Sequence, residues 1–71
     1  MFQYTVEVER EEDGRWIAEV PELPGVMVYG QSQGEAVNRA EALALRVLAD
    51  KIDAEATSRS ELAMTVTFAS V

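Results

Sequence analysis

Pro21-Glu22-Leu23-Pro24-Gly25 decides the fold of this chain, together with the segment Val26-Met27-Val28-Tyr29-Gly30 that leads on to Ser32. The two prolines cannot continue a helix or a central strand, because proline lacks the N–H group that both structures use. The glycine between them and the next segment weakens either structure further. The chain must therefore turn stiffly at residues 21–25. This turn separates a half with the pattern of strands from a half with the pattern of a helix.

Two segments before the turn alternate between apolar and polar residues, the period of two that is typical of a half-buried strand. The first segment, residues 2–9, has on one face Phe2, Tyr4, Val6 and Val8. The second segment, residues 15–20, has on one face Trp16, Ala18 and Val20. Asp13-Gly14 lies between them and predicts a tight turn with glycine at positive φ, so the two strands form an antiparallel hairpin.

Charges on the outer face predict the register of this hairpin. If the two apolar faces coincide, Arg15 lies near Glu9, so that opposite charges meet outside and apolar groups meet inside. Ile17 is an apolar residue on the outer face, and it is either an ordinary exposed isoleucine or part of a contact surface. Trp16 has the parity of the inner face, which favours the core over a role as an interface anchor.

Residues 26–29 have the pattern of a third, short strand with no polar side chain on either face. Such a strand is either covered on both sides or lies at a sheet edge and awaits a partner. Met27 and Tyr29 are therefore candidates both for the core and for a partner contact. The apolar strand and the small core together predict a homo-oligomer.

A helix begins shortly after this strand. Ser32-Gln33-Gly34-Glu35 matches the S-x-x-E capping box, in which the serine oxygen accepts the Glu35 amide and the glutamate reaches back to the Ser32 amide. Apolar residues then recur at spacings of three and four, namely Ala36, Val37, Ala40, Leu43, Ala44, Val47 and Leu48. We expect an i,i+4 pair between Glu35 and Arg39, and a helix end near Ile52 or Asp53.

A final alternating segment, residues 62–68, predicts a fourth strand after a polar loop at 53–60. A right-handed crossover by the helix places this strand beside the first strand and parallel to it. The predicted fold is α+β, a two-layer sandwich of order β-β-β-α-β with a four-stranded mixed sheet, spatial order 3-2-1-4, and one helix on one face. The uncovered face would carry Thr5, Glu7, Glu9, Ile17, Glu19, Thr65 and Thr67.

Composition limits the chemistry that this chain can perform. Its 71 residues make one domain, and without cysteine or histidine it lacks a thiolate nucleophile and the commonest general base and metal ligand. The net charge of −7 disfavours direct nucleic-acid binding; it suits a basic protein partner, or it keeps a small protein soluble. The sequence shows no signal peptide and no membrane-spanning apolar run, and the absence of cysteine fits the cytoplasm.

A hairpin, the turn Val20-Pro21-Glu22-Leu23-Pro24-Gly25, the later Gly30 and the helix start at Glu35-Ala36 together resemble the HicB-like antitoxin family. Members of that family share a V-P-[DE]-L-P-G turn, a following glycine and an E-A helix start, and the likeness covers roughly residues 4–48. The resemblance implies a β-β-β-α-β domain likened to a pared-down ribonuclease H fold. It also implies a non-catalytic antitoxin that binds and blocks a small basic toxin, one that cleaves messenger RNA.

The chain departs from the family pattern in two places. Val26 stands where the family often has cysteine, and the residues up to Val71 show no counterpart of the family's C-terminal DNA-binding segment. We therefore expect no direct contact with nucleic acid. A partner surface on this domain would use exposed acids and the apolar residues near them, with the candidates Glu7, Glu9, Ile17, Glu19, Glu22, Met27 and Tyr29.

Two other functions stay open. The same fold could serve as an oligomeric binding or regulatory module without a toxin partner. Alternatively, Glu7, Glu9 and Glu19 on a ribonuclease-H-like sheet would match a metal-dependent nuclease. Such a site needs several convergent acids with supporting residues, whereas an acidic strand face in contact with solvent is the ordinary pattern of a one-sided sheet. We therefore expect no catalytic, metal or cofactor site.

Overall fold

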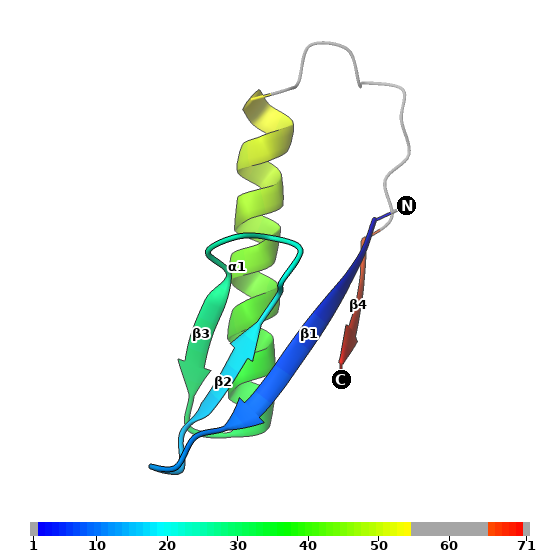
Figure 1. Ribbon diagram of the computed structural model, residues 1–71. Coiled ribbons are helices and arrows are strands. Elements are labelled where there is room, and N and C mark those ends of the chain that lie inside the picture. The colour runs from blue at the N-terminus through cyan, green and yellow to red at the C-terminus, as the bar shows by residue number, and fades with distance from the viewer. Residues whose placement is uncertain (1, 55–65, 71) are drawn as a thin grey trace.

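The computed structural model describes residues 2–54 and 66–70 (Figure 1). These residues form the strands β1 (Phe2–Arg10), β2 (Trp16–Glu19) and β3 (Met27–Gly30), the helix α1 (Gln33–Ala54) and the strand β4 (Val66–Ser70). The strands make one sheet of order β3-β2-β1-β4, in which β1 and β4 are parallel and the other neighbours are antiparallel. The predicted α+β topology is confirmed, while residues 62–65 of the predicted last strand lie outside the described residues.

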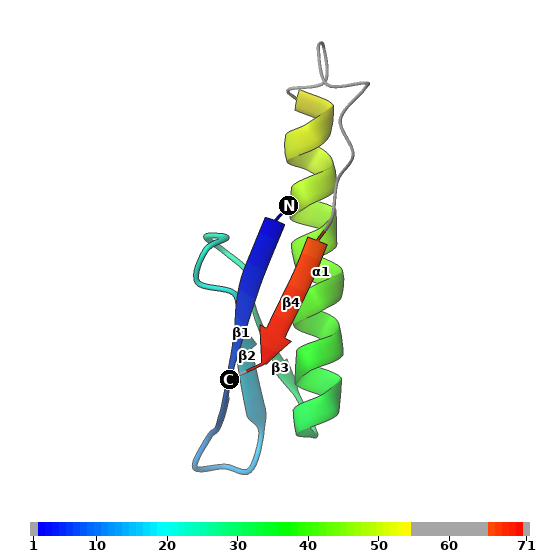
Figure 2. The ribbon, with the colours of Figure 1, turned by 90° about the vertical axis from the view of Figure 1, so that its right-hand side faces the viewer.

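The described part of the chain has two layers, with α1 against one face of the sheet and the other face uncovered (Figure 2). The core between the layers contains Tyr4, Val6, Ala18, Val20, Leu23, Val26, Ala36, Ala40, Ala44 and Leu48. Trp16 and Phe68 pack against this core, as their strand parity predicts, and the Phe68 ring lies 6.0 Å from the Tyr4 ring. No polar or charged side chain is buried among the described residues, so burial of apolar surface is the main stabilising term.

The stretch 21–25 folds as two successive tight turns around a buried leucine. The Leu23 N–H donates to the Val20 carbonyl at 3.0 Å, and the Val26 N–H donates to the Leu23 carbonyl at 3.1 Å. All three of these side chains are buried, while both prolines are exposed. Gly25 has a φ of 91°, in the left-handed region that favours glycine. The turn therefore fills the end of the core as well as changing the direction of the chain.

Glu22 ties this turn to β1. Its two carboxylate oxygens accept the Thr5 N–H at 3.2 and 3.1 Å. The register pairs Glu7 with Glu19, so continued pairing would set Thr5 opposite Pro21, where the chain has already turned away. The Glu22 side chain thus takes the place of a strand carbonyl. Hydrogen bonds from the backbone amides of Glu22 itself and of Thr5 lower the pKa of this carboxyl group.

The β1–β2 hairpin differs in register from the sequence-based expectation. Glu9 pairs with Ile17, so Arg15 does not lie opposite Glu9. The reason is the geometry of the turn, because the Glu11 N–H donates to the Arg15 carbonyl at 2.7 Å and closes the loop of residues 12–14. Gly14, at a φ of 92°, supplies the left-handed position that such a short loop needs.

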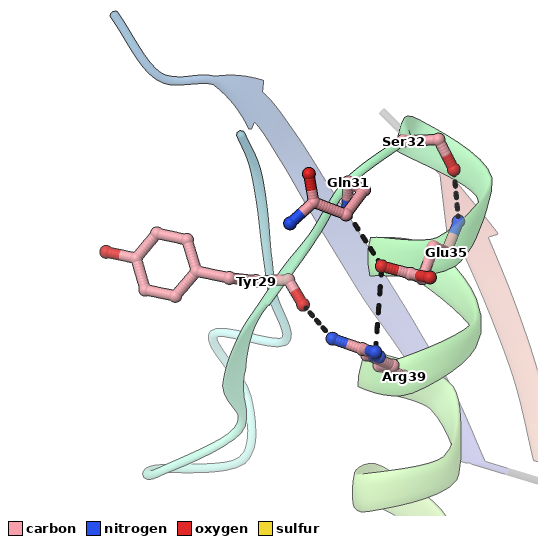
Figure 3. Close-up of polar contacts among 5 residues, drawn as sticks. All are labelled: Tyr29, Gln31, Ser32, Glu35 and Arg39. Atoms are coloured by element: carbon pink, nitrogen blue, oxygen red, sulfur yellow. Dashed lines mark hydrogen bonds and ion pairs between the residues drawn. The ribbon is translucent and has the colours of Figure 1, made fainter. Parts of the chain in front are cut away.

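The start of α1 contains half of the predicted capping box (Figure 3). The Glu35 N–H donates to Ser32 Oγ at 3.1 Å, as predicted. The Glu35 carboxylate, however, accepts the Gln31 N–H at 2.7 Å and not the Ser32 N–H, because Gln31 directly follows the edge strand and has no neighbouring strand to bond. The same carboxylate lies 3.6 Å from Arg39 Nη2, the predicted i,i+4 pair. The helix continues to Ala54, slightly beyond its predicted end.

β3 approaches α1 most closely at Gly30. A Cβ atom added to Gly30 would lie 2.5 Å from the backbone nitrogen of Ala36 and 2.9 Å from its Cα. No side chain fits at this distance, so glycine is needed here for the contact between the layers. Ala36, Ala40 and Ala44 continue the stripe of small side chains that α1 turns toward the sheet.

Gly30→Ala is expected to lower the free energy of unfolding by about 2–3 kcal/mol, because the added methyl group must push β3 away from the first turn of α1. Gly34→Ala is the matched control, since nothing lies within 4 Å of a Cβ atom there. Alanine at 34 should stabilise the helix by about 0.5–1 kcal/mol. Urea denaturation measures both effects. A free energy of unfolding equal to that of the wild type in Gly30→Ala would show that β3 and α1 can move apart without loss of stability.

Glu22→Gln is expected to remove an acid-sensitive part of the stability. Because folding lowers the pKa of Glu22, its contribution is present above the unfolded-state pKa and is lost as the pH falls through the lower folded-state pKa. The wild type should therefore lose more stability than the variant between neutral pH and a pH of about 3. Chemical denaturation across this range measures the difference, with the exposed turn residue Glu12 changed to Gln as the charge-matched control. If the free energy of unfolding changed with pH in the same way for Glu22→Gln and the wild type, the hydrogen bond from Thr5 to Glu22 would not contribute to the acid-sensitive stability.

Candidate interaction surface

The uncovered side of the sheet brings most of the candidate contact residues together. We name its central part the open face and define it as Glu7, Glu9, Glu11, Arg15, Ile17, Glu19, Met27 and Tyr29. Strand pairing sets these residues in rows across β1, β2 and β3. One row contains Glu7, Glu19 and Met27, and the next contains Glu9, Ile17 and Tyr29. Thr5 and Thr67 lie farther along the same side of the sheet, and Thr65 is outside the described residues.

The open face has an acidic side along β1. Glu7, Glu9 and Glu11 follow one another at every second residue, and Glu19 lies directly opposite Glu7 on β2. None of these four carboxylates forms an ion pair within residues 2–54 and 66–70. Sequence reasoning left out Glu11, although continuing the alternation of β1 by two residues would have found it. Negative charge is therefore concentrated on this side without compensation from the described residues.

Met27 and Tyr29 form the apolar side of the open face. Their side chains are 54% and 41% exposed, so both lie on the surface and not in the core. The Tyr29 ring points away from α1 (Figure 3). The guanidinium carbon of Arg15 lies 4.4 Å from the centre of this ring, a cation–π contact that sequence reasoning did not anticipate.

Arg15 is the cation of the open face, and its own hairpin already holds it. Its Nε atom donates to Asp13 Oδ2 at 2.8 Å, and its backbone N–H donates to Asp13 Oδ1 at 3.0 Å. The hydrogen bond from the Arg15 backbone, followed by the bond and the charge of its side chain, lowers the pKa of Asp13. Arg15 therefore compensates Asp13 and leaves the glutamates of β1 and β2 unpaired.

An open hollow of about 260 Å³ lies between β1 and β2 on the acidic side. It is lined by Glu7, Val8, Glu9, Glu11, Ile17 and Glu19. Ile17 is half-buried and gives the hollow an apolar wall among the carboxylates. Such a hollow suits a long cationic side chain, because its methylene groups can pack on the apolar wall while its charged head meets the carboxylates.

Glu22 is the candidate residue that the structure sets apart from the others. It lies in the turn between β2 and β3, and its carboxylate accepts the Thr5 N–H. A partner that bound Glu22 would have to compete with this bond. The position of Glu22 thus gives it a structural role at the edge of β1.

The described residues contain no group of three or more acidic side chains arranged to hold a metal ion. The glutamates of β1 are spaced along one strand, about 7 Å from one to the next, and do not converge on a point. In the same part of the chain, α1 lacks the apolar character that a helix needs to cross a membrane. What the arrangement offers chemically is an acidic surface with an apolar border.

Comparison of the chain with protein-family models, with curated proteins and with solved structures gives no match. The fold and the surface define an α+β protein with one helix on a four-stranded sheet and an acidic, partly apolar sheet face. The likeness to HicB-like antitoxins rests on the turn at 20–25, on Gly30 and on the helix start, and it stays a prediction.

Glu19→Gln is expected to raise the free energy of unfolding by about 0.2–1 kcal/mol, because like charges opposed across a strand pair destabilise the sheet. The gain should shrink at high salt, where the repulsion is screened. Urea denaturation at low and high ionic strength measures it, and Glu41→Gln on α1 serves as the control for a lost charge outside the open face. A loss of stability at low salt would mean that Glu19 has a favourable partner.

Proposed function

We propose that this protein is a non-catalytic, antitoxin-like interaction domain whose open face binds a small basic protein. The observation that supports the proposal is the set of glutamates on β1 and β2 that lack ion pairs within the described residues, beside exposed Met27 and Tyr29. Glu7 and Glu19 even oppose each other directly. Like charges in this position weaken the free domain, and a basic partner would supply the missing counter-charge.

The resemblance over roughly residues 4–48, with its motifs at 20–36, supports the finer assignment, a HicB-like antitoxin with a ribonuclease-H-like domain that acts in the cytoplasm. The partner in that assignment is a toxin that cleaves messenger RNA, and such a toxin is itself small and basic. Its chemistry therefore matches the charge of the open face. The antitoxin would act by occupying the surface with which the toxin holds RNA.

Binding would depend first on charge and then on contact. The net charge of −7 attracts a basic protein over several ångströms and speeds the encounter. In the complex, lysine or arginine side chains of the partner would enter the hollow between β1 and β2. Met27 and Tyr29 would supply the apolar area that holds the complex together after the encounter.

The test begins with the genes on either side of this one. The proposal expects a short neighbouring reading frame that encodes a small basic protein, and co-expression of the two should yield one complex. The double variant Glu9→Lys/Glu19→Lys should weaken binding by about tenfold or more at low salt, largely through slower association. Surface plasmon resonance measures the rates, with Glu41→Lys on α1 as the control that should bind as the wild type does.

Two results would contradict the proposal: no complex with the neighbour's product, or an affinity that does not change when charges on the open face are reversed. An isolated gene together with a stable homo-oligomer would favour a binding or regulatory module of the same fold without a toxin. Cleavage of RNA by the purified protein on addition of a divalent metal ion would favour a metal-dependent nuclease function.

A further inference from the structure

α1 carries a second apolar stripe on the side that faces away from the sheet. The stripe consists of Ala42, Leu45, Ala49 and Ile52, all of which are exposed. Leu45 is 50% exposed and Ile52 is 36% exposed. The C-terminal turns of α1 also extend beyond the ends of the strands (Figures 1 and 2). An apolar surface of this kind is therefore accessible to another helix.

The spacing of the stripe is that of a helix–helix contact. Its residues follow one another at intervals of three, four and three, which is the a/d spacing of a heptad. Ala42 and Ala49 take the a positions, and Leu45 and Ile52 take the d positions. The residues that pack on the protein's own sheet fall instead at the b, c, f and g positions, among them Ala40, Leu43, Ala44, Val47 and Leu48. We name the a/d stripe the helix seam.

We propose that a second copy of this chain packs on the helix seam, with the two α1 helices antiparallel about a two-fold axis. In this arrangement Ala42 faces Ile52 of the second copy, and Leu45 faces Ala49 of the second copy. Every layer then combines one small and one large side chain, so the helices can approach closely without voids. In a parallel arrangement each residue would face its own equivalent. The alanine layers would then leave gaps, and the leucine and isoleucine layers would be crowded.

Charges beside the helix seam also fit the antiparallel arrangement. Arg39 and Asp53 occupy e positions, and the antiparallel pairing brings each Arg39 opposite Asp53 of the other copy. Because Arg39 also contacts the Tyr29 carbonyl and Glu35 of its own chain, this pairing would add a longer-range attraction and not a new direct ion pair. Arg46 lies opposite Arg46 of the second copy near the two-fold axis, where both exposed side chains can turn into solvent. The helix seam itself contains no charge, so the net charge of the chain does not oppose this contact locally.

The edge of β3 is less suited to a second copy. Pairing with β2 leaves the backbone groups of Met27 and Tyr29 directed outward. The Met27 N–H, however, donates to the Gly25 carbonyl at 3.2 Å, and the Tyr29 carbonyl accepts Arg39 Nη1 at 3.0 Å (Figure 3). Groups that an added strand would use are thus engaged within the chain, one of the ways in which proteins protect sheet edges.

A dimer through the helix seam leaves both open faces free, because α1 and the open face lie on opposite sides of the sheet (Figure 2). The two open faces would point away from each other. Such a dimer would bind two basic partners, one on each side, a consequence that rests on the proposed function.

Sedimentation equilibrium from about 1 to 100 μM tests the association. The wild type should be a dimer, and Leu45→Glu should be a monomer with an unchanged circular dichroism spectrum. Met27→Glu makes the same change at an exposed apolar site of the open face and should stay dimeric. A monomeric wild type, or a dimer that survives Leu45→Glu, would overturn the proposal.

Cysteine cross-linking tests the orientation in a chain that has no cysteine of its own. Positions 42 and 52 lie about 15 Å apart along one helix, too far for a disulfide within one chain. The variant Ala42→Cys/Ile52→Cys should therefore oxidise to a covalent dimer, while Ala42→Cys alone should not. Cross-linking of the single variant, or none in the double variant, would overturn the antiparallel arrangement.

The two proposals fail separately. If the helix seam forms the dimer and the open face binds a basic partner, monomeric Leu45→Glu should bind the neighbouring gene's basic product with wild-type affinity for each chain. Loss of dimerisation then leaves binding intact. Loss of binding in Glu9→Lys/Glu19→Lys likewise leaves the dimer intact.

Discussion

The short distance between β3 and the first turn of α1 is the constraint on which the rest of the structure depends. At Gly30 the two backbones lie so close that a Cβ atom would overlap the Ala36 nitrogen. The alanines of α1 hold the helix near β3 and β2, while the Tyr4 and Phe68 rings fill the space toward β4. Because this arrangement fixes which face of the sheet is covered, it also fixes which face is left to solvent. The open face is therefore a consequence of packing on its opposite side.

The short connections and the right-handed crossover predict the sheet order. Periodicity predicts the strand faces because a slip of one residue would turn an apolar face to solvent. It could not predict the position of Arg15, since a slip of two residues keeps every side chain on its face. That choice depends on hydrogen bonds inside the turn. The bonds of Glu22 to Thr5 and of Arg39 to the edge of β3 were also beyond prediction, because long side chains join segments that only the fold brings together. The open face could be predicted from parity, whereas the hollow within it depends on side-chain packing.

The negative charge of the open face results from arrangement as much as from composition. Three arginines lie in or near the sheet. Arg10 has the parity of the covered face of β1, opposite Trp16, while Arg15 and Arg39 have other partners. Arg15 bonds Asp13 and covers the Tyr29 ring, and Arg39 bonds the Tyr29 carbonyl and Glu35. Both arginines thus support the ends of the hairpin and of β3. Because Arg15 and Arg39 are engaged elsewhere, they do not neutralise the negative potential of the glutamates of β1 and β2. That potential would act on a cationic partner before contact.

The two surfaces of this domain differ in the physics that would bring a partner to them. Association through the helix seam depends on burial of Leu45 and Ile52, which salt does not screen. Association through the open face depends on charge, and it weakens as ionic strength rises. Two copies that met through the acidic sides of their open faces would place glutamate against glutamate, which disfavours self-association there. The charge that would attract a basic partner therefore also disfavours contact between two copies at this face.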